Sequence, residues 1–278
     1  MDEQQIKKHR QMTETPVGPL ILRLALPCIV SMLVTAFYNM ADTFFVGMLK
    51  SNAATGAVGV VFSLMAIIQA IGFFFGQGSG NFISRAIGHK NYEEASEMAS
   101  TGFFSALATG VLICALGLLF LEPLAYLLGS TDTILPYTKA YLSVILLGAP
   151  WMTSSLVLNN QLRFQGSAAY AMVGITSGAV LNIGLDPLLI FGVGIFPEMG
   201  IRGAALATGL GQVFTVIVYL IAYKKCSIPV EISRKYLELN RNLDGKLYMV
   251  GIPAILNIAL PSVLISFLNQ ILSAFSGS

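Results

Sequence analysis

The chain has 278 residues, of which 55% are hydrophobic and only 11% are charged. An ordinary soluble domain carries roughly 25% charged residues, so this composition, with a mean hydropathy of +0.74, excludes that class and indicates an integral membrane protein. Glycine is abundant, at 27 residues, which fits helices packed closely in lipid. The net charge of +2 is small, and we expect no nucleic-acid partner.

Apolar stretches long enough to cross a bilayer predict seven transmembrane helices, so the expected fold class is an all-α polytopic membrane protein. The predicted spans cover residues 20–49, 54–75, 96–121, 137–158, 168–191, 201–223 and 247–275. We expect four parts: a cytoplasmic N-terminal tail (1–19), a six-helix transmembrane lobe (20–223), a basic linker (224–246), and the first helix of a truncated second lobe (247–278).

A proline lies early in both the first and the seventh span. Pro27 and Pro253 each follow a basic residue by a few positions and begin an apolar run. The similarity is either a weak internal repeat or chance resemblance between apolar helices. If it is a repeat, the seventh span begins a second, parallel six-helix unit.

Basic residues are distributed unequally between the connections. With the N-terminus inside, the outer side receives only Lys50, Lys139 and Arg202, and the other thirteen of the sixteen Lys and Arg residues fall on the cytoplasmic side. Positive residues are retained in the cytoplasm. We therefore expect a multi-pass protein of the cell (inner or plasma) membrane with a cytoplasmic N-terminus, and no removable signal peptide.

The fifth span contains a polar cluster. A carboxylate such as Asp186 costs about 2.5 to 3.5 kcal/mol at mid-bilayer on insertion scales, which favours a functional role. Asn182 lies four residues earlier on the same helical face, so its amide can donate to the carboxylate. Pro187 cannot bond to the carbonyl of Ile183, which is left free nearby. The cluster is suited to a proton or a small cation, or it is a polar clasp between helices.

Asp42 is the second intramembrane carboxylate, in the first span. Tyr38 and Asn39 precede it by four and three residues and share its helical face. One interpretation is that the span ends near Asn39 and Asp42 is wetted at the outer interface. The other is that Asp42 and Asp186 face one cavity, where two carboxylates in a low dielectric cannot both ionise comfortably and one readily takes up a proton.

Other polar side chains in the spans have two possible roles. Gln69 and Gln77 either line a cavity or bond across helices. Thr208 would by default bond back to its own helix. The polar residues at the end of the fourth span are expected to form a solvated interfacial turn: Asn160, Gln161, Arg163 and Gln165. No catalytic or structural-metal motif is present, and we expect neither an enzyme nor a cofactor.

Several motifs together resemble one known family. Leu26-Pro27 is followed by NMADTFFVG (39–47), ISRAIG (83–88), RFQG (163–166), LNIGLDP (181–187) and GAALAT (203–208). In this order, over residues 20–223, they closely resemble the multidrug and toxic compound extrusion (MATE) transporters.

The resemblance implies twelve helices in two lobes around a central cavity that exports cationic amphipathic drugs in exchange for protons or sodium. The positions that match the family's cation site are Asp42, Asn182, Asp186 and Thr208, of which the first three are also the possible sodium ligands. Tyr38, Asn39, Gln69 and Gln77 are candidates for the substrate cavity. A single lobe with one further helix would need a second lobe for transport. The alternatives are a flippase of lipid-linked precursors, which predicts a strongly basic cavity, and a seven-span receptor, which predicts an external N-terminus.

Overall fold

The structure is a computed structural model that describes residues 6, 10, 14–49, 51–194, 196–226, 228–237 and 245–256. All regular secondary structure in these ranges is helical, and six of the helices are long and apolar enough to cross a membrane. The predicted all-α polytopic class is therefore confirmed. The predicted seventh span lies largely outside the described residues, which include only its start in a short apolar helix, Gly245–Leu256.

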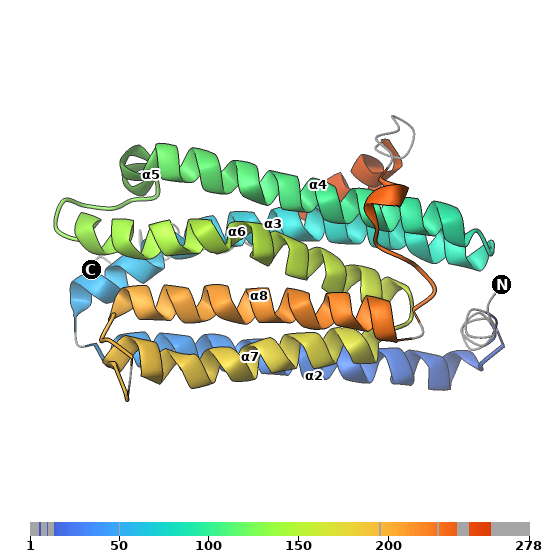
Figure 1. Ribbon diagram of the computed structural model, residues 1–278, viewed down its shortest axis with the longest axis horizontal. Helices are drawn as coiled ribbons and strands as arrows, with labels where there is room; N and C mark the ends of the chain where they lie inside the picture. The colour runs from blue at the N-terminus through green and yellow to red at the C-terminus, as the bar shows by residue number, and fades with distance from the viewer. Residues whose placement is uncertain are drawn as a thin grey trace, which may run out of the picture.

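The six long helices run side by side, with connections at both ends of the bundle (Figure 1). Their bounds are α2 Val17–Gly47, α3 Asn52–Gly88, α4 Tyr92–Leu119, α6 Leu135–Phe164, α7 Ala168–Phe191 and α8 Ile201–Lys225. A short helix, α5 (Leu121–Leu127), precedes α6, and a 3-10 turn, η1 (Arg234–Tyr236), follows α8.

Helix α3 is longer than the predicted second span, which was expected to end near residue 75 before a glycine-rich section. The glycines do not end the helix, because they form the face on which α6 packs. A Cβ atom on Gly72 would lie 2.7 Å from the side chain of Leu156, and one on Gly76 would lie 3.0 Å from that of Asn160. Glycine at these positions lets the two helices approach closely, as small residues do in membrane bundles.

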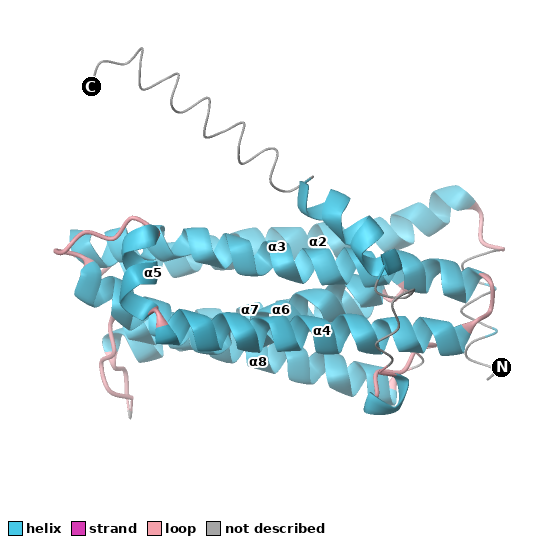
Figure 2. Ribbon diagram, turned by 90° about the horizontal axis from the view of Figure 1, so that it is seen from above, coloured by secondary structure: helices cyan, strands magenta, loops and turns pink. Residues whose placement is uncertain are grey.

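Helix α6 is the centre of the bundle, and α2 is its edge. α6 packs against α3, α4 and α8, and most residues of its second half are buried. α2 instead packs mainly against α7 and scarcely touches α3, its neighbour in sequence. Among the α2 residues, only Ser31 and Val46 are buried. The view from above shows the long helices running along the same axis (Figure 2). Because α2 packs on α7 and scarcely on α3, it stands at the edge of the bundle.

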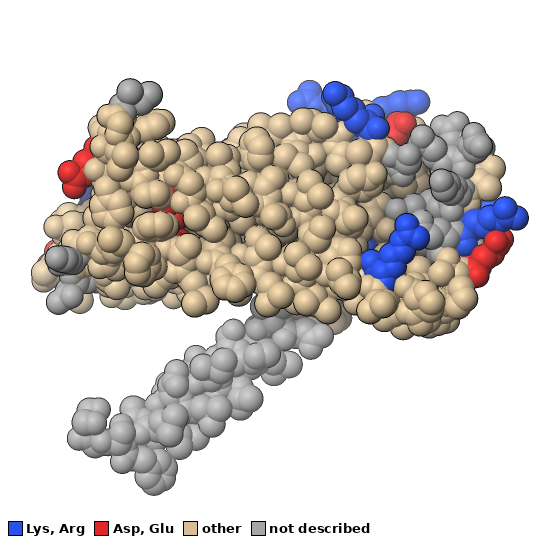
Figure 3. Space-filling view, turned by 90° about the horizontal axis from the view of Figure 1, so that it is seen from below, with Lys and Arg blue, Asp and Glu red and all other residues tan. Residues whose placement is uncertain are grey.

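Basic side chains gather at the end of the bundle that holds the start of α2 (Figure 3). The ends of α3, α6 and α8 lie there too, and their last turns carry Arg85, Arg163 and Lys224 with Lys225. At the same end, the segment after α8 crosses to α4, where the amides of Glu231 and Ser233 donate to serine hydroxyls of that helix. The charge asymmetry inferred along the sequence is thus an asymmetry between the two ends of the bundle.

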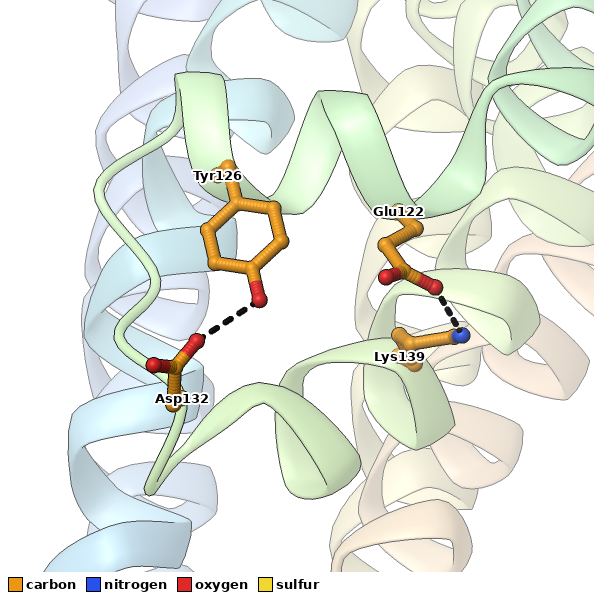
Figure 4. A network of polar contacts seen from close by, with 4 residues as sticks. All are labelled: Glu122, Tyr126, Asp132 and Lys139. Carbon is orange, nitrogen blue, oxygen red and sulfur yellow. Dashed lines mark hydrogen bonds and ion pairs between the residues drawn. The ribbon is translucent and has the colours of Figure 1, made fainter.

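At the opposite end, a polar network joins α5 to the start of α6 (Figure 4). Lys139 Nζ lies 2.8 Å from Glu122 Oε2, and the hydroxyl of Tyr126 donates to Asp132 over 2.7 Å. The hydrogen bond to the Asp132 carboxylate raises the pKa of Tyr126 above its ordinary value. These groups are exposed, so the network holds the connection in place and contributes little to stability.

Candidate functional site

A cavity of about 300 Å³ opens where α2 stands apart from α3, and α6, α7 and α8 complete its wall. Five of the side chains selected from the sequence line it: Tyr38, Asn39, Gln69, Asn182 and Thr208. Helices α2, α3, α7 and α8 each contribute at least one of them. The fold therefore brings together residues separated by up to 170 positions in the chain.

Gln77 was also predicted to line a substrate cavity, and it is not on this wall. It follows Gln69 by eight positions along α3, and it is half-buried. The prediction that Gln77 lines the substrate cavity is therefore wrong for this cavity.

Asn182 is held by α8 and not by its own helix. Its Nδ2 atom lies 3.5 Å from Thr208 Oγ1, and both residues are at most 3% exposed. The contact forms because the helices meet through glycine: a Cβ atom on Gly211 would lie 3.1 Å from the carbonyl oxygen of Gly178. The expectation that Asn182 donates to Asp186 is wrong, because neither carboxylate oxygen of Asp186 has a hydrogen-bond partner among the described residues.

Asp42 and Asp186 lie close enough to act on each other electrostatically, although they come from different helices. Packing of α2 against α7 brings them together. Both also act on the hydroxyls of Tyr38 and Tyr141. Neither carboxylate lines the cavity, so the interpretation in which Asp42 and Asp186 face one cavity is not confirmed, and their role as an ion site stays a prediction.

The acceptor oxygens in this region lack donors. Among the described residues, no hydrogen-bond partner contacts Asp42 Oδ1, Asn182 Oδ1 or either carboxylate oxygen of Asp186, and all four atoms are buried. A buried polar atom without a partner costs roughly 1 to 3 kcal/mol, and more when it is charged. Helix α7 also continues through Pro187 to Phe191, which leaves the carbonyl oxygen of Ile183 without its helical donor. The oxygens form a set suited to a proton or to a hard monovalent cation.

Sequence reasoning missed Tyr141. This tyrosine is 1% exposed and lies on α6, close enough to both aspartates for them to act on its hydroxyl electrostatically. Nothing local in the sequence marks it, because a tyrosine in an apolar helix is usually a packing or interfacial residue. Only the central position of α6 shows that its hydroxyl lies near both aspartates.

The polar residues at the end of α6 were expected to be a solvated turn, and this expectation is wrong. Gln161 and Gln165 are fully buried, and Asn160 is 5% exposed. Gln161 Nε2 donates to Ser79 Oγ and to the carbonyl of Ala99, and Gln165 Nε2 donates to the Tyr223 hydroxyl over 2.8 Å. α6 continues to Phe164 within a ring of neighbouring helices, so these amides find partners in the protein and not in water.

The same helix supplies polar side chains to the cavity wall. Ser155 Oγ donates to Gln212 Oε1 over 2.6 Å, and Asn159 Nδ2 lies 2.6 Å from the hydroxyl of Tyr219. Arg163, one turn beyond Asn159, also lines the cavity. The sequence could have revealed these residues through their common helical face, since positions 155, 159 and 163 are four apart.

Comparison with known proteins identifies relatives that share this architecture. The family model described as MatE matches residues 27–188. The multidrug export protein MepA of Staphylococcus aureus is 29% identical over 262 residues, which are 94% of this chain and 56% of MepA. The chain thus spans about half the length of the curated relatives it matches.

Two solved structures share the fold. One is a MOP superfamily transporter from Pyrococcus furiosus, described as having a binding pocket of reverse polarity, with 30% identity, a TM-score of 0.82, and coverage of 91% of this chain and 55% of that one. The other is an outward-facing multidrug resistance MATE family transporter, with 30% identity, a TM-score of 0.81 and the same coverage.

Proposed function

The chain belongs to the MatE family of transporters, and on this premise we propose that it is a lobe of a cation-coupled antiporter that exports cationic or amphipathic small molecules. The observation that carries the coupling is the group of buried, unpartnered oxygens on Asp42, Asn182 and Asp186. An ion or proton bound there would satisfy acceptors that the described part of the protein leaves without donors.

The proposed coupling of ion binding to substrate release depends on Asn182, which belongs to both the ion site and the cavity wall. Asn182 and Thr208 line the cavity, whereas Asp186 does not and lies one helical turn beyond Asn182 on α7. A single proton or sodium ion shared by the two aspartates would cancel one of their two negative charges and so weaken their mutual repulsion, which would let α2 move toward α7. Since α2 is one wall of the cavity, this movement would narrow it and release the substrate.

The proposed orientation places the basic end of the bundle in the cytoplasm of a cell whose plasma membrane holds the protein. Supporting this are Arg85, Lys224 and Lys225 at one end, against Lys139 and Arg202 at the other. By the positive-inside rule, the basic end stays in the cytoplasm. The aspartates then load from the outside, because Asp42 lies near the end of α2 opposite to the basic one.

Transport by this mechanism requires a second lobe. Alternating access in two-lobed transporters comes from rocking one repeat against the other around a fixed site. The chain spans 56% of MepA, so the substrate, the export activity and the partner lobe are all parts of the proposal.

Two other functions have less support. A flippase of lipid-linked precursors predicts a strongly basic cavity, but Arg163 is the one basic residue among the described residues that line this cavity. A seven-span receptor was suggested by span count alone, and membership of a transporter family weighs against it.

The experiment that tests the proposal measures ion binding and transport separately. In purified protein, binding of radioactive sodium and proton uptake should fall at least tenfold in Asp186→Asn and remain unchanged in Glu198→Gln, an exposed acid between α7 and α8. In everted membrane vesicles in which a second lobe accompanies this one, ethidium transport driven by an imposed proton or sodium gradient should stop in the same variant. Undiminished, gradient-dependent transport by inserted Asp186→Asn protein would falsify the assignment.

A further inference from the structure

Arg163 is the one charged residue among the described residues on the cavity wall. It lies in the last turn of α6, at the basic end of the bundle. The carboxylates of Asp42 and Asp186 do not line the cavity. The cavity therefore presents a cation to whatever enters it, although a site for purely cationic molecules would be expected to present an anion.

The guanidinium lacks acceptors within the described part of the protein. Its Nε atom is buried and has no hydrogen-bond partner. The ion pairs between described residues join Arg10 with Glu14, Lys139 with Glu122, and Lys246 with Glu94, and none includes Arg163. A buried donor on a charged group is costly unless an acceptor meets it.

The polar neighbours of Arg163 on the cavity wall are already engaged with one another. The Tyr219 hydroxyl lies 2.9 Å from the carbonyl oxygen of Ala171 and bonds to Asn159, and Ser155 bonds to Gln212. These contacts hold polar side chains of the wall in place, and none of them supplies Arg163 with a carboxylate. They make a rigid rim beside a free cation, which is an arrangement suited to binding an external anion.

The other residues of the cavity wall indicate what kind of molecule would bear the anionic group. Met32, Phe73, Leu156 and Ile175 line the same cavity. From Met152 to Arg163 the wall follows α6 for eleven residues, or roughly 16 Å at the rise of an α-helix. An apolar body of this length with an anionic group at one end would fill the cavity and reach Arg163.

We propose that Arg163 is a specificity-determining residue that binds the carboxylate of amphipathic substrates, zwitterions included. Its planar guanidinium can hold a carboxylate through two parallel hydrogen bonds, which an ammonium cannot reproduce. The inference rests on the proposed function, because it assumes that small molecules occupy this cavity. A role as a basic residue that only anchors the end of α6 at the membrane surface is the competing account.

The test uses two fluorescent probes that differ in one group. Rhodamine B has a free carboxylate, and its ethyl ester has the same cationic rings without that anion. Dissociation constants for both are measured by fluorescence anisotropy with the 278-residue chain in lipid nanodiscs, with empty nanodiscs as the blank. The variants are Arg163→Gln, Arg163→Lys and, as a matched control, Arg202→Gln at the opposite end of the bundle.

The expected result is a change in the ratio of the two dissociation constants. Arg163→Gln should weaken rhodamine B binding about tenfold and ester binding less than twofold, and Arg163→Lys should weaken rhodamine B by about threefold. Arg202→Gln should leave both constants unchanged. Equal weakening of both probes, or no weakening of either, overturns the role of Arg163 while leaving the proposed function intact. Failure of the wild-type chain to bind either probe overturns both.

A second measurement needs no substitution and covers the case in which Arg163→Gln does not fold. Phenylglyoxal modifies accessible arginines, and mass spectrometry reports each site. Rhodamine B should slow modification at Arg163 at least threefold, whereas the ester should not, and Arg202 should react equally in all samples. Equal protection by both probes, or protection by neither, would contradict the proposal.

Discussion

The Nδ2 atom of Asn182 lies 3.5 Å from Thr208 Oγ1 on the neighbouring helix, and it makes no hydrogen bond to Asp186 on its own helix. Both oxygens of Asp186 are then buried without a described donor. The Thr208 hydroxyl thus offers the Asn182 amide an acceptor other than the Asp186 carboxylate. The proposed ion site depends on this arrangement between α7 and α8.

Replacing Thr208 by valine should weaken ion binding. The variant keeps the shape of the side chain but removes Oγ1, so the Asn182 amide is free to donate to Asp186 and compete with the ion. The lost hydrogen bond is worth about 1 kcal/mol, and we expect a several-fold weaker affinity for sodium or protons, measured by direct titration. Thr215→Val is the control, because the Thr215 hydroxyl bonds to the Gly211 carbonyl within α8. If Thr208→Val and Thr215→Val weakened ion binding equally, Thr208 would have no specific role in the ion site.

Asp42 and Asp186 should behave as parts of one site. Each single Asp→Asn variant is expected to weaken ion binding at least tenfold, and the double variant should be no weaker than the worse single variant, because residues that act as a unit are not additive. Equilibrium binding of radioactive sodium and proton uptake provide the measurement, with the exposed Asp132→Asn as control. Losses that multiply in the double variant would indicate two separate sites.

Gly203 should tolerate no side chain. A Cβ atom there would meet the backbone carbonyl of Leu189 on α7, which cannot move aside as a side chain can. Gly203→Ala is expected to lower stability by about 1 to 3 kcal/mol through overpacking, measured as the thermal unfolding midpoint in detergent. Gly209→Ala is the matched control on α8, since nothing lies within 4 Å of its added Cβ. It should be neutral or slightly stabilising.

The buried pair of Gln165 and Tyr223 should show strong coupling. Gln165→Leu leaves the Tyr223 hydroxyl buried without its 2.8 Å partner, at a cost of about 1 to 3 kcal/mol. Gln165→Leu combined with Tyr223→Phe should recover much of this loss, because both polar groups are then gone. A double-mutant cycle on thermal stability measures the coupling, and simple additivity would show that the bond contributes nothing.

The Tyr126 network predicts a loss of stability at alkaline pH. Its hydrogen bond to Asp132 raises the pKa of Tyr126 in the folded protein above that of the unfolded chain. The contact therefore stabilises the fold at neutral pH and is lost as the pH rises through the pKa of the folded state. The thermal midpoint of Tyr126→Phe should lie slightly below that of the wild type at pH 7, and the difference should vanish at high pH. A difference that stays constant with pH would exclude this origin.

Hydropathy alone was enough to predict the six described spans, because the length of an apolar run is a local property. The predicted span at 168–191 agrees with α7, Ala168–Phe191. The costly carboxylates could also be found in this way, since a charge in an apolar helix stands out wherever the helix packs. The division into lobes, linker and second-lobe helix, like the roles of the site residues, remains a prediction.

Only the tertiary structure determined which neighbours each polar side chain contacts. Asn182 bonds to Thr208 because glycines on α7 and α8 let those helices approach, and Gln161 is buried because α6 became the central helix. Arg163 lines a cavity because α2 stands apart from α3. A sequence pattern shows which face of a helix a side chain occupies, but it does not show which other helix meets that face. For a polar group in a membrane, that second fact decides whether it is satisfied, or left free to bind an ion or a substrate.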